Sequence, residues 1–355
     1  MFSDNDPLIA IGPDNRTYWL MLLVRSEAIV HWKFIYYVVI VLEVILTLTG
    51  FYLHYRGAML VWKYKFLHIN FLILGMNVYG VMVIGSLARL VSILYETRII
   101  KLPSLGYEPV PTLAILRQLS YAHAFCFLYV VTIERFCATW YVSDYERNKR
   151  MHISVILCII ISSSSTIAGY LIVTGYVNGI LISAFALIPN IMCAIMFRRM
   201  LIHNKKRHAS LTNEMKRRSS DEYSLSLRVQ LKENIWSMQK IEFGVYALTI
   251  ALTANLLIVF LPVYFLSDPA HFERLQWFTC AGNLSFSLTI TTTAPLLEMI
   301  VEIHKGNIPR FLVRLFGREL FEDTRRKEYR TETDVYFIQL NNQWTLAMIP
   351  SKKKY

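Results

Sequence analysis

Long apolar runs separated by short charged segments make up most of the 355-residue chain. A helix that crosses about 30 Å of hydrocarbon needs roughly 20 mostly apolar residues. The pattern predicts seven such helices, at residues 34–53, 66–95, 113–137, 153–174, 176–197, 243–266 and 275–301. The expected fold is therefore an all-α membrane protein, a seven-transmembrane helix bundle that occupies residues 34–303.

The fourth and fifth predicted helices form one uninterrupted apolar stretch. Residues 153–197 contain no charged side chain, and as a single helix they would extend about 67 Å, twice the thickness of the hydrocarbon core. The chain must therefore fold back within this stretch. Gly175 and Gly179 lie in the segment where a turn is expected.

Composition agrees with a membrane protein. Hydrophobic residues make up 55% of the chain and charged residues 17%, whereas soluble domains carry about 25% charged residues. This balance excludes a disordered chain and argues against an ordinary soluble enzyme. The five cysteines form no CxxC pair and no zinc-type spacing with histidine, so neither a metal nor another cofactor is expected.

The basic residues predict the orientation. With the amino terminus outside, 29 of the 37 Lys and Arg residues fall on the cytoplasmic side, seven fall outside, Arg117 among them, and Arg89 falls within a span. Cytoplasmic loops of membrane proteins carry such an excess. Residues 1–33 are therefore expected to be extracellular, with a glycosylation acceptor at Asn15, and the third inner loop is expected at about 198–240.

The remaining segment, residues 304–355, is expected to be a cytoplasmic tail. Its first part, about 307–317, places Phe311, Leu312 and Leu315 on one face and Arg310 and Arg314 on another. This pattern predicts a short amphipathic helix that lies along the inner membrane interface and binds lipid.

Topology alone leaves several classes of function open. A retinal protein needs a lysine in the last span, and residues 275–301 contain none. No predicted span contains an aspartate for an aspartyl protease, and no HExxH motif occurs. No internal repeat of the kind found in many transporters is evident. A catalytically silent receptor that binds a small molecule and signals to an inner partner fits best, with no role for nucleic acid.

The third predicted helix ends in a charged motif. Glu134 and Arg135 stand next to each other at its cytoplasmic end, followed by Phe136. An acid can hold the guanidinium in a resting state, and its release exposes a rigid donor fork to a partner. A plain interfacial ion pair is the alternative reading of this pair alone.

The longer segment 134–146, ERFCATWYVSDYE, is more specific. It resembles the segment that marks the nematode chemoreceptor family called serpentine receptor class epsilon (Sre), and residues 67–70, LHIN, are also similar to that family. The resemblance implies a G-protein-coupled receptor in the plasma membrane of a sensory neuron, in its cilium. It also implies a heterotrimeric G protein as partner and coupling roles for Asp144, Tyr145 and Glu146.

Polar residues in hydrocarbon are costly and call for an explanation. Five of them are predicted at intermediate depth and could meet in one layer: Glu43, Asn77, His123, Asn255 and Asn283. The layer is either an interhelical hydrogen-bond network or a ligand-contacting, protonation-sensitive site. The outer half of a pocket would add three aromatic residues, Tyr121, Tyr264 and Trp277, and Arg89 is expected to extend to the outer surface.

Two functional hypotheses follow. In the first, an ion pair between Arg135 and Glu242 clamps the third and sixth helices in the resting receptor, although Glu242 could instead pair locally with Lys240. In the second, the chain is an ion- or proton-coupled transporter or a ligand-gated channel that uses the layer around Glu43. An accessory membrane protein without a ligand is a third reading of the sequence.

Overall fold

The computed structural model describes residues 9–11, 15–20, 22–26, 29, 31–64, 69–101, 106–141, 151–177, 179–217, 222–265 and 271–304. The elements are a short hairpin and long helices: β1 (Ile9–Ile11), β2 (Thr17–Trp19), α1 (Lys33–Tyr64), α2 (Ile69–Glu96), α3 (Val110–Trp140), α4 (Met151–Val173), α5 (Gly179–Arg217), α6 (Glu222–Phe265) and α7 (Phe272–His304). Contacts divide the chain into two units, residues 1–300 and 301–355, and the bundle described below belongs to the first.

Within the described residues, six helices are long and apolar enough to cross a membrane. They are α1 to α6, over residues 33–59, 69–96, 110–140, 151–173, 186–213 and 230–258. The prediction of a predominantly helical membrane protein is therefore confirmed. α7 has 33 residues and is not one of these six.

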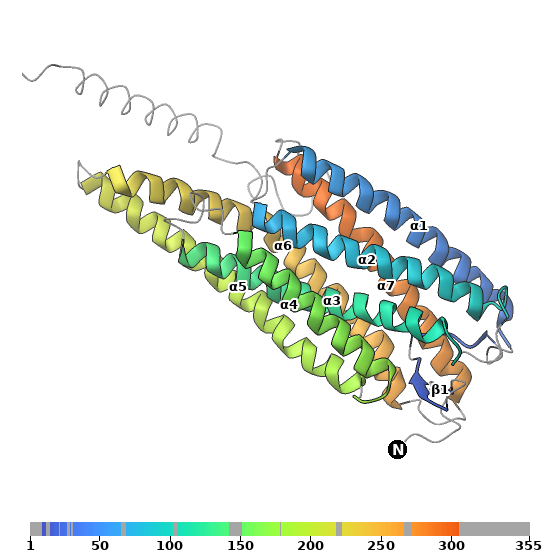
Figure 1. Ribbon diagram of the computed structural model, residues 1–355. Helices are drawn as coiled ribbons and strands as arrows, with labels where there is room; N and C mark the ends of the chain where they lie inside the picture. The colour runs from blue at the N-terminus through green and yellow to red at the C-terminus, as the bar shows by residue number, and fades with distance from the viewer. Residues whose placement is uncertain are drawn as a thin grey trace, which may run out of the picture. The chain divides into compact units, whose positions relative to one another are not determined.

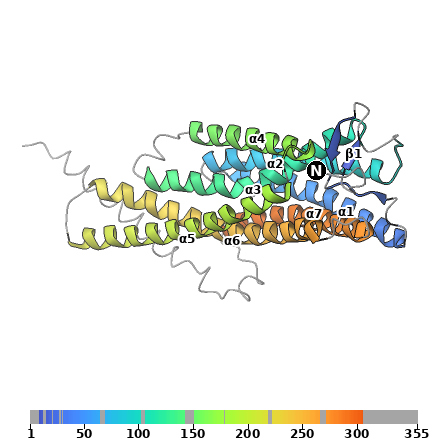
Figure 2. The same cartoon turned by 90° about the horizontal axis from the view of Figure 1, so that it is seen from below.

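The bundle is organised around α3, which packs against α2, α4, α5 and α6. Figure 1 shows the long helices of the bundle side by side, and in Figure 2 α4 lies on one side of α3 while α5 and α6 lie on the other. α1 packs against α2, and α7 is tied to α1 by a 2.8 Å hydrogen bond from Thr291 Oγ1 to the carbonyl oxygen of Leu46.

Small residues let the helices approach closely. A Cβ atom added to Gly85 of α2 would overlap the side chain of Ser120 on α3, and one added to Gly169 of α4 would lie 3.1 Å from the backbone nitrogen of Leu119. Small residues at helix interfaces allow such backbone approach in membrane proteins.

The predicted fold-back between the fourth and fifth helices is present. α4 ends at Val173, and Gly175 adopts a φ of +74°, which glycine reaches without steric cost. Hydrogen bonds from Gly175 N to Ile172 O and from Val177 N to Leu171 O close the turn.

Two helices extend well beyond the ends that hydropathy predicts. α5 continues from residue 197 to Arg217, and α6 begins at Glu222 rather than near residue 243. Neither extension contains glycine or proline. Lys, Arg, Glu, Gln, Leu and Met favour helix in water as well as in lipid, so the helices do not stop where the apolar pattern stops.

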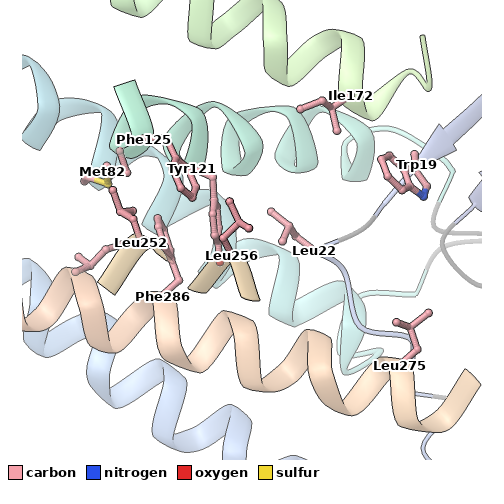
Figure 3. Packing of buried hydrophobic residues seen from close by; sticks show 12 residues of the cluster. Trp19, Leu22, Met82, Tyr121, Phe125, Ile172, Leu252, Leu256, Leu275 and Phe286 are labelled. Carbon is pink, nitrogen blue, oxygen red and sulfur yellow. The ribbon is translucent and has the colours of Figure 1, made fainter. Parts of the chain in front are cut away.

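The amino-terminal segment folds onto the bundle. β1 and β2 pair antiparallel, with Ile9 opposite Trp19. Trp19 and Leu22 then enter a buried cluster with Tyr121 of α3, Phe286 of α7 and eight further residues (Figure 3). The end of the hairpin and the segment after it therefore form part of the hydrophobic core at this end of the bundle.

Candidate functional site

A network of buried charges joins α1 and α2. Arg89 Nε donates to Glu43 Oε1 over 2.7 Å, and its Nη2 donates to Glu43 Oε2 over 3.0 Å. Its Nη1 donates to Glu96 Oε1 over 2.5 Å. The expectation that Arg89 extends to the outer surface is wrong, because its side chain is 1% exposed. Two carboxylates compensate the burial of its charge.

A second arginine extends the network to α3 and α7. Arg117 Nη2 lies 3.9 Å from Glu43 Oε1 and donates to Asn283 Oδ1 over 3.4 Å. Its guanidinium carbon lies 5.4 Å from the ring centre of Tyr121 and 5.1 Å from that of Phe286, within cation–π range. Arg117 is therefore not an outer-loop residue as the charge count assumed; it is 3% exposed within α3.

The amino-terminal segment closes over this network through its backbone. Val24 N donates to Glu96 Oε1 over 3.0 Å, and Asn283 Nδ2 donates to the carbonyl oxygen of Leu22 over 3.0 Å. Arg25 N donates to Gln276 Oε1 over 2.8 Å.

Sequence reasoning missed four members of this site, Arg89, Glu96, Arg117 and Gln276. The available signal was the run of seven apolar residues at 18–24, YWLMLLV, in a segment expected to be extracellular. An apolar run of that length outside a span indicates a buried segment, so the polar residues at the neighbouring helix ends would be expected beneath it.

The five predicted polar residues do not form one layer. Glu43 and Asn283 meet through Arg117, as described above. Asn77 and His123 form a separate pair, with His123 Nε2 2.9 Å from Asn77 Oδ1, and Asn255 Nδ2 donates to Thr289 Oγ1 over 2.9 Å. A shared depth along the helices does not bring side chains together, because depth does not fix which way each side chain faces.

The predicted aromatic residues have different surroundings. Tyr121 stacks on Phe286 with ring centres 3.7 Å apart and an interplanar angle of 15°. Trp277 packs against a cluster that contains Tyr36, Ile40 and Cys280. Tyr264 lies in α6, and its side chain is outside the described part.

A cavity of about 160 Å³ lies between α1, α2, α3, α6 and α7. Most of its eighteen lining residues are apolar, Met82, Leu128 and Leu252 among them, and Phe286 forms part of its wall. His54 lines it from α1. None of the residues predicted for the pocket or polar layer lines this cavity, which lies between Phe286 and the end of α3 that carries Glu134 and Arg135.

The Glu134–Arg135 pair lies at the far end of α3 and is buried. Arg135 donates to Glu134 Oε2 from Nε over 2.5 Å and to Oε1 from Nη2 over 2.7 Å. Its Nη1 also donates to α6, to Asn234 Oδ1 over 3.3 Å and to Ser237 Oγ over 3.2 Å. Glu134 is 0% exposed and Arg135 is 3% exposed.

Further polar contacts surround this pair. Asn234 Nδ2 and Asn204 Nδ2, on α6 and α5, both donate to Thr139 Oγ1, over 3.2 and 3.0 Å. Phe136 is 47% exposed and lies over Trp140 with ring centres 6.0 Å apart. Arg135 is thus the centre of a polar cluster that joins α3, α5 and α6.

The expected ion pair between Arg135 and Glu242 is not formed. Glu242 instead accepts hydrogen bonds from Arg198 Nη1 over 2.5 Å and from the Tyr246 hydroxyl over 3.2 Å. The reason is axial distance along α6, because Ser237, which Arg135 reaches, lies five residues or about 7.5 Å from Glu242. Glu242 ties α6 to α5, and its role in coupling stays a prediction.

Several predicted residues have only partial structural context. Asn15 is exposed, with a φ of +57°, in the turn between β1 and β2. Leu67, His68, Asp144, Tyr145, Glu146 and the predicted tail helix at 307–317 lie outside the described residues. Among the residues that are described, no group of three or more His, Cys, Asp or Glu is placed to hold a metal ion.

Comparison with known proteins identifies relatives along most of the chain. The family model for "Sre G protein-coupled chemoreceptor" matches residues 106–345. Serpentine receptor class epsilon-1 of Caenorhabditis elegans is 25% identical over 295 residues, 77% of this chain and 79% of the relative. Class epsilon-2 of the same organism is 27% identical over 241 residues, 62% of each chain. Class epsilon-12 is 31% identical over 124 residues, 34% of this chain and 36% of the relative.

Proposed function

The chain belongs to the Sre family of G protein-coupled chemoreceptors, and from that premise we propose that it senses a small chemical and passes the signal to a heterotrimeric G protein. In this proposal the protein works by a change of conformation, without catalysis. A ligand that binds the active conformation better than the resting one shifts the population between them.

The proposed topology has seven spans, the amino terminus outside and the tail in the cytoplasm. Support for α7 as the seventh span comes from residues 275–297, which carry no charge over 23 residues. Support for the orientation comes from the excess of basic residues on the proposed inner side. The proposed location is the plasma membrane, in the cilium of a sensory neuron, with residues 307–317 along the inner interface. A sugar on Asn15 would then be extracellular.

The observation that carries the coupling proposal is the position of Arg135. Its guanidinium bonds both to Glu134 of its own helix and to Asn234 and Ser237 of α6. These bonds hold α3 and α6 together at the proposed cytoplasmic end. Separation of the two helices would free the guanidinium, which is permanently charged, to bind a carbonyl or carboxylate of the G protein.

Other predicted coupling residues are assigned to the same end. Phe136 and the segment Asp144–Glu146 would contact the G protein next to Arg135, and Glu242 would fix the spacing of α5 and α6 through Arg198.

The transporter or channel hypothesis is less favoured. An ion or proton path through Glu43 needs a carboxylate that can exchange its partner. Both carboxylate oxygens of Glu43 are held by Arg89, and Arg117 lies 3.9 Å from one of them. This arrangement suits a structural network better than a relay.

The test is expression in a reporter cell with a panel of small odorants and secreted metabolites. We expect a ligand-dependent recruitment of G protein without membrane current, and its loss in Arg135→Ala at equal surface expression. A ligand-evoked current that persists when the G protein is absent would contradict the proposal and favour the channel.

A further inference from the structure

We propose that the cavity between α1, α2, α3, α6 and α7 is a binding site for a small, mostly apolar molecule that carries one hydrogen-bonding group. The inference names the class of ligand that the proposed receptor would bind. Binding to the cavity does not depend on the proposed function; only the effect of the ligand on signalling rests on it. It is carried by the volume of the cavity, its lining and two glycines that face it.

The lining combines apolar walls with one imidazole. Met82, Leu128 and Leu252 contribute apolar surface from α2, α3 and α6. His54 is 5% exposed, and its ring lies 5.0 Å from that of Tyr79, which also lines the cavity. One of its ring nitrogens faces the backbone carbonyl of Ile290, and neither nitrogen forms a further hydrogen bond with the described residues. A neutral imidazole has one donor and one acceptor. With its N–H directed at the Ile290 carbonyl, His54 can accept one hydrogen bond from an occupant.

Two glycines on facing helices leave part of this space open. A Cβ atom built on Gly75 of α2 or on Gly244 of α6 would meet nothing within 4 Å, and both residues line the cavity. Glycine is less favourable than alanine inside a helix. At Gly85 the neighbouring Ser120 explains the absence of a side chain, whereas Gly75 and Gly244 instead face empty space.

The volume limits the ligand. An apolar cavity of about 150 Å³ in another protein stays dry and binds benzene, and the present cavity measures about 160 Å³. The fitting class is therefore a monocyclic aromatic or a short aliphatic compound of about six to nine non-hydrogen atoms, with one hydroxyl directed at His54.

The position of the cavity places a bound molecule near the bonds between Arg135 and α6 that the coupling proposal invokes. Val131 lines the cavity one helical turn before Arg135, and Ile241 lines it one turn after Ser237 of α6. On the opposite side Phe286 separates the cavity from Arg117. A bound molecule therefore contacts α3 and α6 close to the bonds that join them.

Direct binding to the purified full chain in lipid nanodiscs tests the site without a G protein. The probes are toluene and p-cresol, which differ by one hydroxyl, and the readouts are saturation-transfer NMR and the ligand-dependent shift in melting temperature. We expect both probes to bind, with p-cresol tighter by about threefold to tenfold through its bond to His54. His54→Leu should remove that difference and leave toluene binding in place.

Two variants that fill the cavity, and one matched control, test whether the probes bind there. Gly75→Leu and Gly244→Leu should abolish binding of both probes, because each side chain enters the cavity. Gly80→Leu places the same residue on α2 at a position where a Cβ also meets nothing within 4 Å but which does not line the cavity, and it should bind like the wild type. Melting curves without ligand confirm that each variant is folded, and Gly75→Ala serves as a milder variant that should weaken binding.

The outcomes separate this site from the proposed function. Failure of the wild type to bind either probe, or unchanged binding in folded Gly75→Leu and Gly244→Leu, overturns the site. Binding that obeys these expectations while Arg135→Ala leaves G-protein recruitment unchanged supports the site and contradicts the coupling proposal.

Discussion

Arg89 of α2 donates two hydrogen bonds to Glu43 of α1, over 2.7 and 3.0 Å, and both side chains are 1% exposed. The pair joins two helices within the bundle, and Glu96 shares the same guanidinium. A buried ion pair of this kind is weak evidence for net stabilisation, but removal of one partner leaves a charge without compensation. Because Glu43 and Glu96 are buried, the folded protein needs Arg89 to compensate their charges.

Arg89→Met should destabilise the protein more than any single change to its partners. The variant leaves Glu43 and Glu96 buried with Arg117 as the nearest cation to Glu43, and the expected loss is about 3–5 kcal/mol. Thermal denaturation of the detergent-solubilised protein measures this loss of stability. Arg199→Met, at an exposed position of α5, is the matched control. A melting temperature equal to that of the control would show that the network is not needed for stability.

The contact between Gly85 and Ser120 predicts a size limit at the α2–α3 interface. Gly85→Ala should destabilise the bundle by about 1–3 kcal/mol, because the new methyl overlaps the serine side chain. Ser120→Gly in the same chain should restore most of the loss. Gly80→Ala, with open space around its Cβ, should instead be neutral or stabilising by up to about 1 kcal/mol, and a loss of similar size in both alanine variants would contradict the packing argument.

Hydrophobic periodicity and charge predicted the positions of the helices, but they did not predict the contacts between residues that are distant in the sequence. The six membrane-capable helices and the turn at Gly175 could be predicted, because hydropathy over about 20 residues is a local property. The ends of α5 and α6 could not, because residues 198–217 and 222–242 favour helix whether or not lipid surrounds them.

The predicted positions of the buried arginines were wrong for a different reason. Arg117 lies close to the start of α3 and is counted as an outer charge if only its distance from the helix end is considered. Its burial depends on Glu43 and Asn283, which are supplied by α1 and α7. The Glu134–Arg135 pair was predictable because the two residues are adjacent, whereas its bonds to Asn234 and Ser237 depend on how α6 is rotated.

The amino-terminal segment should be a structural part of the bundle. Trp19 is 5% exposed in a cluster with Tyr121 and Phe286, so Trp19→Ala should destabilise the protein by about 3–5 kcal/mol. Trp32→Ala removes the same side chain at a position that is 57% exposed and should have little effect. Limited proteolysis and thermal melting measure both, and equal behaviour of the two variants would contradict the burial of this segment.

The bonds between Arg135 and α6 predict constitutive signalling when they are removed. Asn234→Ala deletes one bond to Arg135 and one to Thr139, and Ser237→Ala deletes a second bond to Arg135, while the Glu134–Arg135 pair is kept. A neutral hydrogen bond contributes about 0.5–1.5 kcal/mol, and one to a charged group about 1.5–3 kcal/mol. If these bonds favour the resting state, their loss should raise the active population by about tenfold or more in the double variant.

Basal recruitment of G protein, normalised to surface expression, measures that population without a ligand. Gln239→Ala is the matched control, since Gln239 is an exposed residue of the same helix, two positions beyond Ser237. The order expected is wild type and Gln239→Ala lowest, each single variant intermediate and the double variant highest, with the signal abolished when Arg135→Ala is added. Basal recruitment that stays at the wild-type level in the double variant would mean that these bonds do not hold the resting state, and that α3 and α6 are kept together by the apolar packing around Leu231 and Met238 instead.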